Sequence, residues 1–471
     1  MKRPGQLLRG HAAMFMAFVV VLCAPLSVQA DGALVARVDA LLAPLEAAHQ
    51  FSGAVVLVRD GVVVARRGVG IANRTVRTAM TPATPVDGGS LAKTFTAAGI
   101  WWLAQEGRLD VDAPVTRYLP EFPHARTTVR QLISHSNGLP PYYEFFDPYF
   151  GKDEVRTTEG LLKVVARRAP KPRFEPGTRF EYSNVGYDTL ALVIERVSGQ
   201  GYEAFVRERF FLPNAMTMSF ARPARFADWP GVRTIGYRWR NGTWRLYDAY
   251  DLEAFLGASN LIFTADDLAR WASAHAAGRA VPAAVEAIGQ QRSPIAGRPS
   301  PITGLSWYCD APGTRCYYTG VNNALYSLAY WDRARNEAVA LVSNSATPPW
   351  QMITLQRSLV DALAGRPVVV SAPLQFERFD PKQLATLAGS YRVEGLGTVT
   401  LRPGNEGLLL RVDDGLEFDM FPVSREVLYV PGPDVFVAFS DGARPARLHI
   451  RSMFIDASGA RVAPAAVAPA R

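Results

Sequence analysis

The stretch from residue 88 to residue 105 constrains this chain more than any other part of its sequence. It begins with the hexapeptide Gly-Gly-Ser-Leu-Ala-Lys at 88–93, and the residues after it are rich in Ala, Leu, Ile and Trp and include no proline. An apolar run of this length predicts a buried helix over 93–105. Gly107 stands where such a helix is expected to end. The sequence therefore places Ser90 in the first turn of a buried helix.

Ser90 and Lys93 are three residues apart, so they share one face of that helix. Free backbone N–H groups and the helix dipole favour developing negative charge at a helix N-terminus. A desolvated lysine can take the proton of a serine hydroxyl and make it a nucleophile, whereas arginine cannot. A helix cap and a solvated charge are the structural alternative. Lysine is rare in this chain compared with arginine, so a lysine in so apolar a position favours a functional role. This stretch alone nevertheless leaves both hypotheses open, the catalytic pair and the helix cap with a solvated charge.

The first thirty residues have the pattern of a secretory signal peptide. Basic residues at positions 2, 3 and 9 precede an apolar run over 12–22, and small residues end at Ala30. The apolar run is too short to cross a bilayer and remain there. We therefore expect cleavage after Ala30, and a periplasmic or secreted protein without a transmembrane segment.

The composition limits the partners that we expect. With 471 residues the chain is long enough for two domains, and its net charge is +8. The arginines are scattered, so a nucleic-acid partner is not expected. Two cysteines remain after the expected cleavage and the six histidines are scattered, so no metal site and no cofactor are expected. The pattern gives no indication of an oligomeric state.

Those two cysteines, Cys309 and Cys316, flank a Pro-Gly turn signal and have aromatic neighbours. The segment is typical of a β-hairpin, and export makes oxidation feasible. We therefore expect a Cys309–Cys316 disulfide across the hairpin.

The elements expected between residues 34 and 364 indicate an α/β domain. Strands are expected at both ends, over 53–59, 62–66, 304–309, 316–319, 325–330 and 338–343. Helices are expected between or beside them, over 34–48, 93–105, 127–134, 187–198, 203–212 and 353–363 and after Thr264. The Asp60-Gly61 pair is typical of a tight hairpin turn. This arrangement predicts one sheet that joins the N-terminal hairpin to the C-terminal strands.

The pattern changes near residue 366, where short alternating strands begin to dominate. They are expected over 397–401, 407–412, 417–422, 427–430, 436–439 and 447–454, which predicts a small antiparallel barrel or sandwich. We therefore expect a first domain over 31–366, a C-terminal β domain over 367–462, and a loose Ala/Pro-rich tail over 463–471.

A second candidate group is the tripeptide Tyr182-Ser183-Asn184. A tyrosine beside an ammonium group can act as a general acid or base, and an asparagine amide can bind a substrate amide. Alone, the tripeptide is more typical of a helix cap.

In chain order, Ser90-x-x-Lys93, Tyr182-Ser183-Asn184 and Thr319-Gly320 resemble the motifs of the serine β-lactamase and penicillin-binding-protein superfamily. The second motif is most similar to that of class C β-lactamases and the esterases and D-aminopeptidases grouped with them. Further matching segments lie at 51–55, 106–110, 132–140, 175–177 and 261–268. The resemblance implies an antiparallel sheet flanked by helices, with an all-helical insertion. The C-terminal β domain resembles the lipocalin-like barrels that follow the catalytic domain in some of these relatives.

The resemblance also assigns roles to individual residues. Ser90 would be the nucleophile, Lys93 its base, and Tyr182 the proton carrier to and from the leaving group. Asn184 would hold the acyl side chain, and the backbone N–H groups of Ser90 and Val321 would form the oxyanion hole. His135 lies at a position that is structural in the family, so we interpret it as a core histidine.

The third motif departs from the family pattern. The family has Lys or His before Thr319 and Gly320, whereas this chain has Tyr318 and so lacks a fixed charge toward a substrate carboxylate. The leading hypothesis is an exported serine hydrolase that cleaves a small-molecule ester, amide or peptide, D-amino-acid peptides included, through an acyl-enzyme. The alternative is a weak or inactive penicillin-binding-like module that binds cell-wall peptide fragments.

Overall fold

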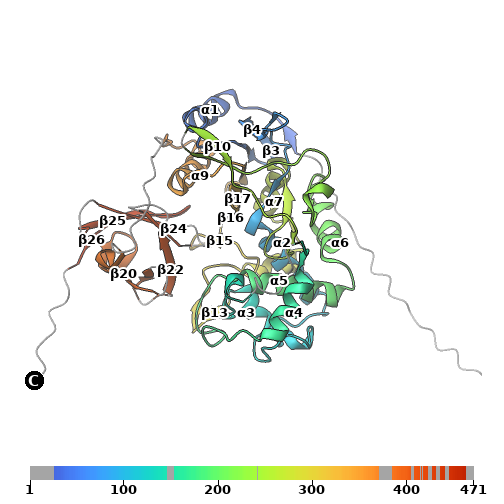
Figure 1. Cartoon of the computed structure of the whole chain (residues 1–471). Coiled ribbons are helices and arrows are strands. Elements are labelled where there is room, and N and C mark those ends of the chain that lie inside the picture. Colours follow the sequence, from blue (N-terminus) through green and yellow to red (C-terminus); the bar gives the residue numbers. More distant parts are fainter. Residues whose placement is uncertain are drawn as a thin grey trace, which may run out of the picture.

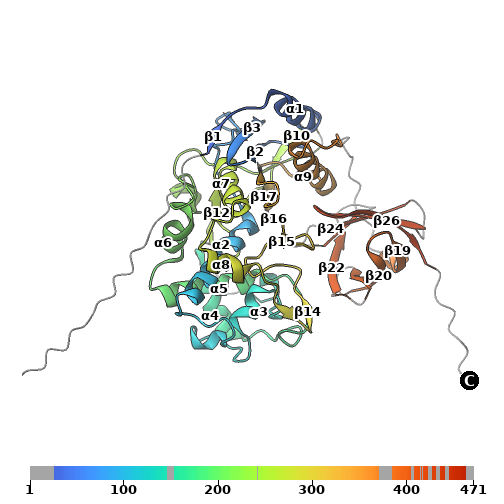
Figure 2. The same ribbon diagram turned by 180° about the vertical axis from the view of Figure 1, so that it is seen from behind.

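The computed structural model describes residues 26–145, 153–240 and 242–370, and in the C-terminal region residues 384–404, 408–413, 415, 417–422, 427–430, 435–440 and 445–462. A larger unit of helices and sheet lies beside a smaller β unit (Figures 1 and 2). The expected tail lies outside the described residues, as does most of the expected signal peptide. In the described part of the chain, no helix combines the length and apolar character needed to cross a membrane.

The larger unit is built on a seven-stranded sheet with the order β1-β3-β2-β18-β17-β16-β15. Its strands are β1 (Ser27–Val28), β2 (Gly53–Arg59), β3 (Val62–Val69), β15 (Tyr308–Cys309), β16 (Arg315–Asn322), β17 (Leu325–Asp332) and β18 (Glu337–Ser343). β1 pairs with β3 in parallel, and the other neighbours are antiparallel. β2 pairs with β18 from Gly53 opposite Ser343 to Arg59 opposite Glu337. The predicted union of N-terminal and C-terminal strands in one sheet is confirmed.

The hairpin between β2 and β3 follows directly from its sequence. Asp60 and Gly61 have φ values of 51° and 73°. Positive φ at both central residues is the geometry that an Asp-Gly pair favours in a two-residue hairpin. The apolar run of β2 is buried along almost its whole length because both faces of the sheet are covered.

Helices cover the sheet on both sides (Figures 1 and 2). α1 (Gly32–Ala47) and α9 (Pro349–Leu363) pack together on one side, and α7 (Ala265–Ala276) packs on the other. α7 begins where the sequence predicts, because the Thr264 hydroxyl accepts the N–H of Asp267 at 3.0 Å and caps the helix.

A helical region lies beside this sheet and is organised around α5. α5 packs against α2, α3, α4 and α6. The bounds are α2 (Ala92–Gln105), α3 (Val129–Ile133), α4 (Thr158–Arg168), α5 (Asn184–Ser198) and α6 (Tyr202–Val206), and α8 (Ala283–Gly289) packs on α2. This region is the helical insertion that the family resemblance implies.

The smaller unit is a closed eight-stranded antiparallel barrel. Its strands are β19 (Gly389–Val393), β20 (Gly397–Pro403), β21 (Leu408–Val412), β22 (Glu417–Pro422), β23 (Val427–Val430), β24 (Val435–Phe439), β25 (Arg447–Arg451) and β26 (Asp456–Arg461). The alternation pattern predicts the six strands in the middle but neither β19 nor β26, whose pairing closes the barrel. β26 has no apolar alternation, and its Gly459 is needed because a Cβ there would lie 2.7 Å from the Arg392 carbonyl oxygen.

The expected disulfide is present. Cys309 on β15 lies directly opposite Cys316 on β16, and their sulfur atoms are bonded. The bond therefore ties the short edge strand to the strand that carries the third motif.

Removing this disulfide is expected to lower the free energy of unfolding by about 2–3 kcal/mol, the chain-entropy value for so short a loop. The measurement is urea unfolding of the wild type and of a Cys309→Ala, Cys316→Ala double variant. A double variant as stable as the wild type would contradict this prediction, as would two free thiols in the denatured, unreduced protein.

Candidate active site

The turn that carries Ser90 is seated against β16. It is a short 3-10 turn, η1 (Gly89–Leu91), which leads directly into α2. A Cβ on Gly89 would lie 2.6 Å from the Val321 nitrogen, and a Cβ on Gly320 would lie 1.8 Å from the Gly88 oxygen. Glycine at 89 and 320 therefore allows the turn and the strand to touch. This contact brings Val321 of the predicted oxyanion hole to the Ser90 turn.

A buried polar network anchors the same turn. The Asp87 carboxylate accepts the Gly89 N–H at 2.9 Å and the Asn322 side-chain N–H at 3.1 Å, and it lies 3.6 Å from the Arg222 guanidinium. Burial raises the pKa of Asp87, and the nearby Arg222 charge opposes that shift. The Ser327 hydroxyl donates to the Gly88 oxygen at 2.6 Å. Sequence reasoning missed this network, because its members come from four separate parts of the chain.

Lys93 is fully buried and lies beside Ser90. Its Nζ donates to Ser90 Oγ at 3.3 Å, to Asn184 Oδ1 at 2.8 Å and to the Ala258 carbonyl oxygen at 2.8 Å. These three acceptors match the three donors of an ammonium group. The structure thus brings the first motif and the asparagine of the second motif together around one lysine.

The segment that supplies the Ala258 carbonyl is pinned between α2 and α5. Thr96 Oγ1 donates to the Gly257 oxygen at 2.7 Å, and the Ala258 N–H donates to Asp188 Oδ1 at 2.9 Å. Gly257 has φ of +110°, and a Cβ there would lie 2.3 Å from the Tyr187 oxygen. No motif in the sequence indicates this segment, because it holds Lys93 through the main chain.

Tyr182 lies on the other side of the lysine. Its ring centroid is 4.8 Å from Lys93 Nζ and 4.6 Å from the His135 ring centroid. Ser183 caps α5 by accepting the Gly186 N–H at 3.2 Å, and the Ser183 N–H donates to His135 Nδ1 at 3.1 Å. The tripeptide therefore caps α5, and it also places Tyr182 beside Lys93.

His135 is fully buried, and its ring packs against the ring of Tyr182. Burial lowers the pKa of His135 well below 6.5, and the positive charge of Lys93 lowers it further. The ring is therefore neutral, with Nδ1 as the acceptor and the proton on Nε2. This arrangement agrees with the interpretation of His135 as a core histidine.

The third motif lies on β16, where Tyr318 is 1% exposed and Thr319 is also buried. The Tyr318 ring packs 5.5 Å from the Tyr308 ring, and its phenol faces that of Tyr182. Burial raises the pKa of Tyr318 well above 10, and Tyr182 adds to the shift. The buried Tyr318 hydroxyl has no hydrogen-bond partner of normal geometry among the described residues. Val321, by contrast, is 52% exposed.

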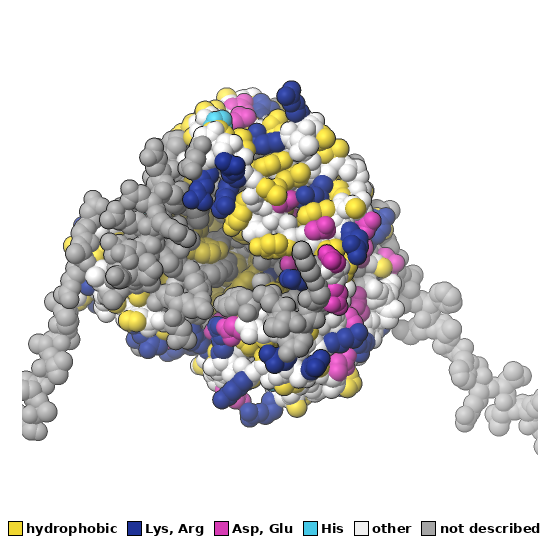
Figure 3. Space-filling model, viewed as in Figure 1, with side chains coloured by type: hydrophobic (Ala, Val, Ile, Leu, Met, Phe, Trp, Pro, Cys, Tyr) yellow, Lys and Arg dark blue, Asp and Glu magenta, His cyan; other side chains and the backbone are white. Residues whose placement is uncertain are grey.

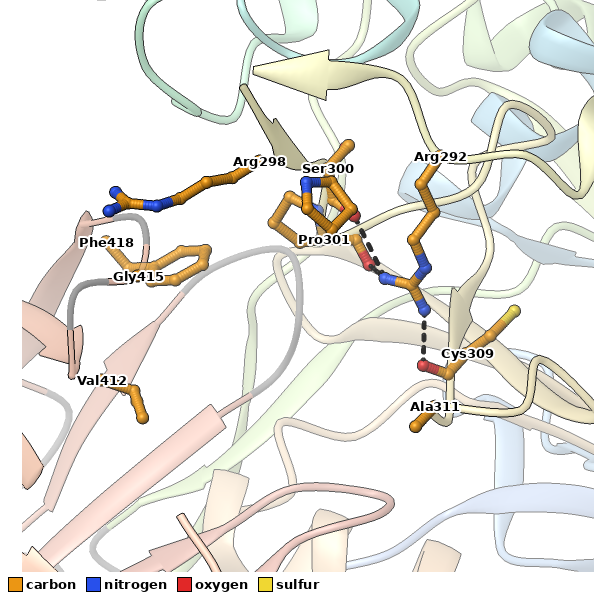
Figure 4. Close-up of a pocket in the computed structure, with 10 residues that line it drawn as sticks. Arg292, Arg298, Ser300, Pro301, Cys309, Ala311, Val412, Gly415 and Phe418 are labelled. Atoms are coloured by element: carbon orange, nitrogen blue, oxygen red, sulfur yellow. Dashed lines mark hydrogen bonds between the residues drawn. The ribbon is translucent and has the colours of Figure 1, made fainter. Parts of the chain in front are cut away.

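A cavity of about 660 Å³ lies between the two units (Figure 4). The larger unit lines it with Arg292, Arg298 and neighbouring residues, and β22 of the barrel contributes Phe418. Arg292 donates to three backbone carbonyl oxygens, those of Ser300, Pro301 and Cys309 (Figure 4). Its guanidinium therefore holds two backbone segments of the larger unit together. The cavity lining does not include Ser90, Lys93 or Tyr182.

The barrel nevertheless reaches the neighbourhood of the second motif. Phe418 packs 5.7 Å from Phe180, and Phe180 packs 5.7 Å from His135. Figure 3 shows a hollow between the units with hydrophobic side chains on its floor, while Lys and Arg are dispersed over this face. Among the described residues no cluster of His, Cys, Asp and Glu could hold a metal ion.

Comparisons with known proteins agree with this geometry. The family model described as Beta-lactamase matches residues 38–364. Penicillin-binding protein 4* of Bacillus subtilis (strain 168) is 33% identical over 168 residues, which cover 36% of this chain and 37% of that protein. The alignments to the first curated relatives span about a third to a half of the relatives' length.

Solved structures share the fold. The octameric penicillin-binding protein homologue from Pyrococcus abyssi has a TM-score of 0.59 at 22% identity, and the match covers 90% of this chain and 99% of that one. A class C beta-lactamase has a TM-score of 0.56 at 20% identity, covering 70% of this chain and 96% of that one. Because the family model matches more than half of the sequence, the chain belongs to the beta-lactamase family of serine hydrolases.

Proposed function

We propose that the protein is an exported serine hydrolase that forms an acyl-enzyme on Ser90 and cleaves an ester or amide bond, D-amino-acid amides and peptides included. The observation that carries the proposal is the position of Lys93, a fully buried lysine 3.3 Å from the Ser90 hydroxyl. The N-terminal signal pattern and the disulfide support export.

The chemistry follows from the positions of these groups. Ser90 Oγ attacks the substrate carbonyl carbon while its proton passes to the neutral form of Lys93, and the carbonyl oxygen becomes an oxyanion. The backbone N–H groups of Ser90 and Val321 stabilise that oxyanion. The bond to the leaving group then breaks as Tyr182 donates a proton to it, and the proton held by Lys93 returns to Tyr182. Water hydrolyses the resulting ester on Ser90 and restores the free hydroxyl. Asn184, which already accepts from Lys93, lies beside the acyl side chain.

A fluorophosphonate probe tests this proposal without knowledge of the substrate. Intact-mass spectrometry after incubation should show one adduct, and peptide mapping should place it on Ser90. A screen of p-nitrophenyl esters, D-amino-acid amides and nitrocefin then identifies the substrate class. A folded protein with no adduct and no turnover would instead support the alternative, a module that binds cell-wall peptide fragments without cleaving them.

Tyr318 is expected to set a preference for uncharged substrates. A neutral phenol replaces the cation that the family uses toward a substrate carboxylate, and hydrogen bonds to charged groups contribute about 1.5–3 kcal/mol. The loss corresponds to roughly tenfold to a hundredfold in affinity. We expect a higher kcat/KM for a neutral p-nitrophenyl ester than for nitrocefin or a D-Ala-D-Ala peptide.

The variants Tyr318→Lys and Tyr318→His test the cause of that preference. Either one should shift the ratio of kcat/KM values toward the carboxylate substrates. Tyr317→Phe is the control, since Tyr317 is the neighbouring tyrosine on β16 and its ring packs against Phe454, which lies between β25 and β26. This variant should leave the ratio of kcat/KM values unchanged. A wild type that already favours carboxylate substrates would show that another group supplies the charge.

A further inference from the structure

Asp188 is a buried carboxyl behind Lys93 that the mechanism above does not use. It lies one turn after Asn184 on α5, so the two side chains share a helix face. The side chain is fully buried. Its Oδ1 accepts the Ala258 N–H at 2.9 Å, and its Oδ2 has no hydrogen-bond partner among the described residues.

Ala258 links this carboxyl to the lysine. Its N–H is held by Asp188 at 2.9 Å, and its carbonyl oxygen accepts from Lys93 Nζ at 2.8 Å. The adjacent Gly257 carbonyl is held by Thr96 at 2.7 Å. Asp188 therefore fixes, through one residue, an acceptor that orients the lysine amine.

The charged and titratable groups around Asp188 come from three other elements. Lys93 faces it from α2, Glu253 from β11 (Glu253–Ala254) and Tyr202 from α6. Burial raises the pKa of Asp188 to about 8; the Ala258 N–H and the Lys93 charge oppose the rise, and Glu253 adds to it. Arg222 lies 4.0 Å from Glu253 and offsets part of that neighbour's charge. The Asp188 carboxyl is therefore largely protonated at neutral pH and gains its charge near pH 8.

We propose that Asp188 is a positioning residue, which accepts the Ala258 N–H and so holds the Ala258 carbonyl against Lys93. The inference rests on the proposed function, in which neutral Lys93 accepts the Ser90 proton. Asparagine at 188 keeps the acceptor oxygen for Ala258 and removes the charge, whereas leucine removes both.

The test is the second-order rate constant for fluorophosphonate labelling of Ser90, measured from about pH 5 to pH 10 in the full chain. Asp188→Asn keeps the acceptor for the Ala258 N–H and should label Ser90 within about threefold of the wild-type rate. Asp188→Leu should be slower at every pH by about a hundredfold, because the lysine is no longer held in place.

Asp267→Asn is the matched control. Asp267 on α7 is also a buried carboxyl whose pKa is raised by burial, but it bonds Ser219 and Arg270 at 2.8 Å each. This variant should label at the wild-type rate. The inference is overturned if folded Asp188→Leu labels as fast as the wild type, or if Asp188→Asn labels as slowly as Asp188→Leu. A wild type that is not labelled at any pH would overturn the proposed function itself, so the two failures are distinguishable.

Discussion

Ser90→Ala is expected to abolish turnover of every substrate that the wild type hydrolyses, with a loss on the order of a millionfold in kcat, the size seen when a nucleophile that works as a unit with its base is removed. The fold should be unaffected. Within the described residues Ser90 Oγ makes one long hydrogen bond, 3.3 Å from Lys93 Nζ. Gly88, Gly89 and Asp87 seat the turn through contacts that do not involve this hydroxyl. The measurements are steady-state kinetics and thermal unfolding of the same preparations.

The matched control is Ser198→Ala at the end of α5, where the hydroxyl accepts the Gln200 N–H at 3.1 Å, far along the helix from the site. That variant should keep full activity. If Ser90→Ala retained more than about a thousandth of the wild-type kcat, the acyl-enzyme hypothesis would be wrong, since binding and the oxyanion hole alone leave only a small residual rate.

Lys93→Arg is expected to lower kcat/KM by about a thousandfold, within the range attributed to a general base. Arginine keeps the positive charge but does not give up a proton in proteins. Its planar guanidinium must also enter a fully buried space that three acceptors fit to a single ammonium nitrogen. The loss should therefore appear mainly in kcat, with some loss of stability.

Lys163→Arg provides the comparison, because Lys163 is exposed on α4. It should leave both activity and stability within error of the wild type. If Lys93→Arg kept more than about a tenth of the activity, Lys93 would not be the base. If raising the pH restored the activity of Lys93→Arg, Lys93 would again not be the base, because no accessible pH deprotonates arginine.

Local chemistry made part of the fold predictable. The Asp60-Gly61 hairpin, the Thr264 cap and the stop of α5 at Gly199, which has φ of 73°, each depend on neighbours in the sequence. The conformations of β19 and β26, the two barrel strands that the pattern missed, do not depend on neighbours in the sequence. β26 is paired on both sides although each of its residues is small or polar, so its conformation is imposed by β19 and β25.

The candidate site also contains residues that the sequence predicts and residues that it does not. Ser90, Lys93 and Tyr182 stand in a recognisable order, and the structure brings them together around the lysine. Asp188 and Ala258 could not be found in this way, because a backbone carbonyl leaves no residue signature and a buried carboxyl resembles any helical aspartate until its surroundings are known. The burial of Tyr318 was equally hard to predict, since its neighbour Tyr182 is remote in the sequence.

The pairing of β2 with β18 has a consequence for how this chain acquires its structure. β2 is among the first strands to be made, yet the partner for one of its edges, up to Ser343, is synthesised only after the whole helical region. Contacts this distant in sequence slow folding, and an apolar strand with an open edge invites incorrect pairing while it waits. β16 and β17 lie beyond β18 in the sheet, so Val321 meets the Ser90 turn only when the late strands have joined the early ones. The Ser90 turn is synthesised early, and a nascent chain carries it for about half of its synthesis before β16, the strand that seats it, has been made.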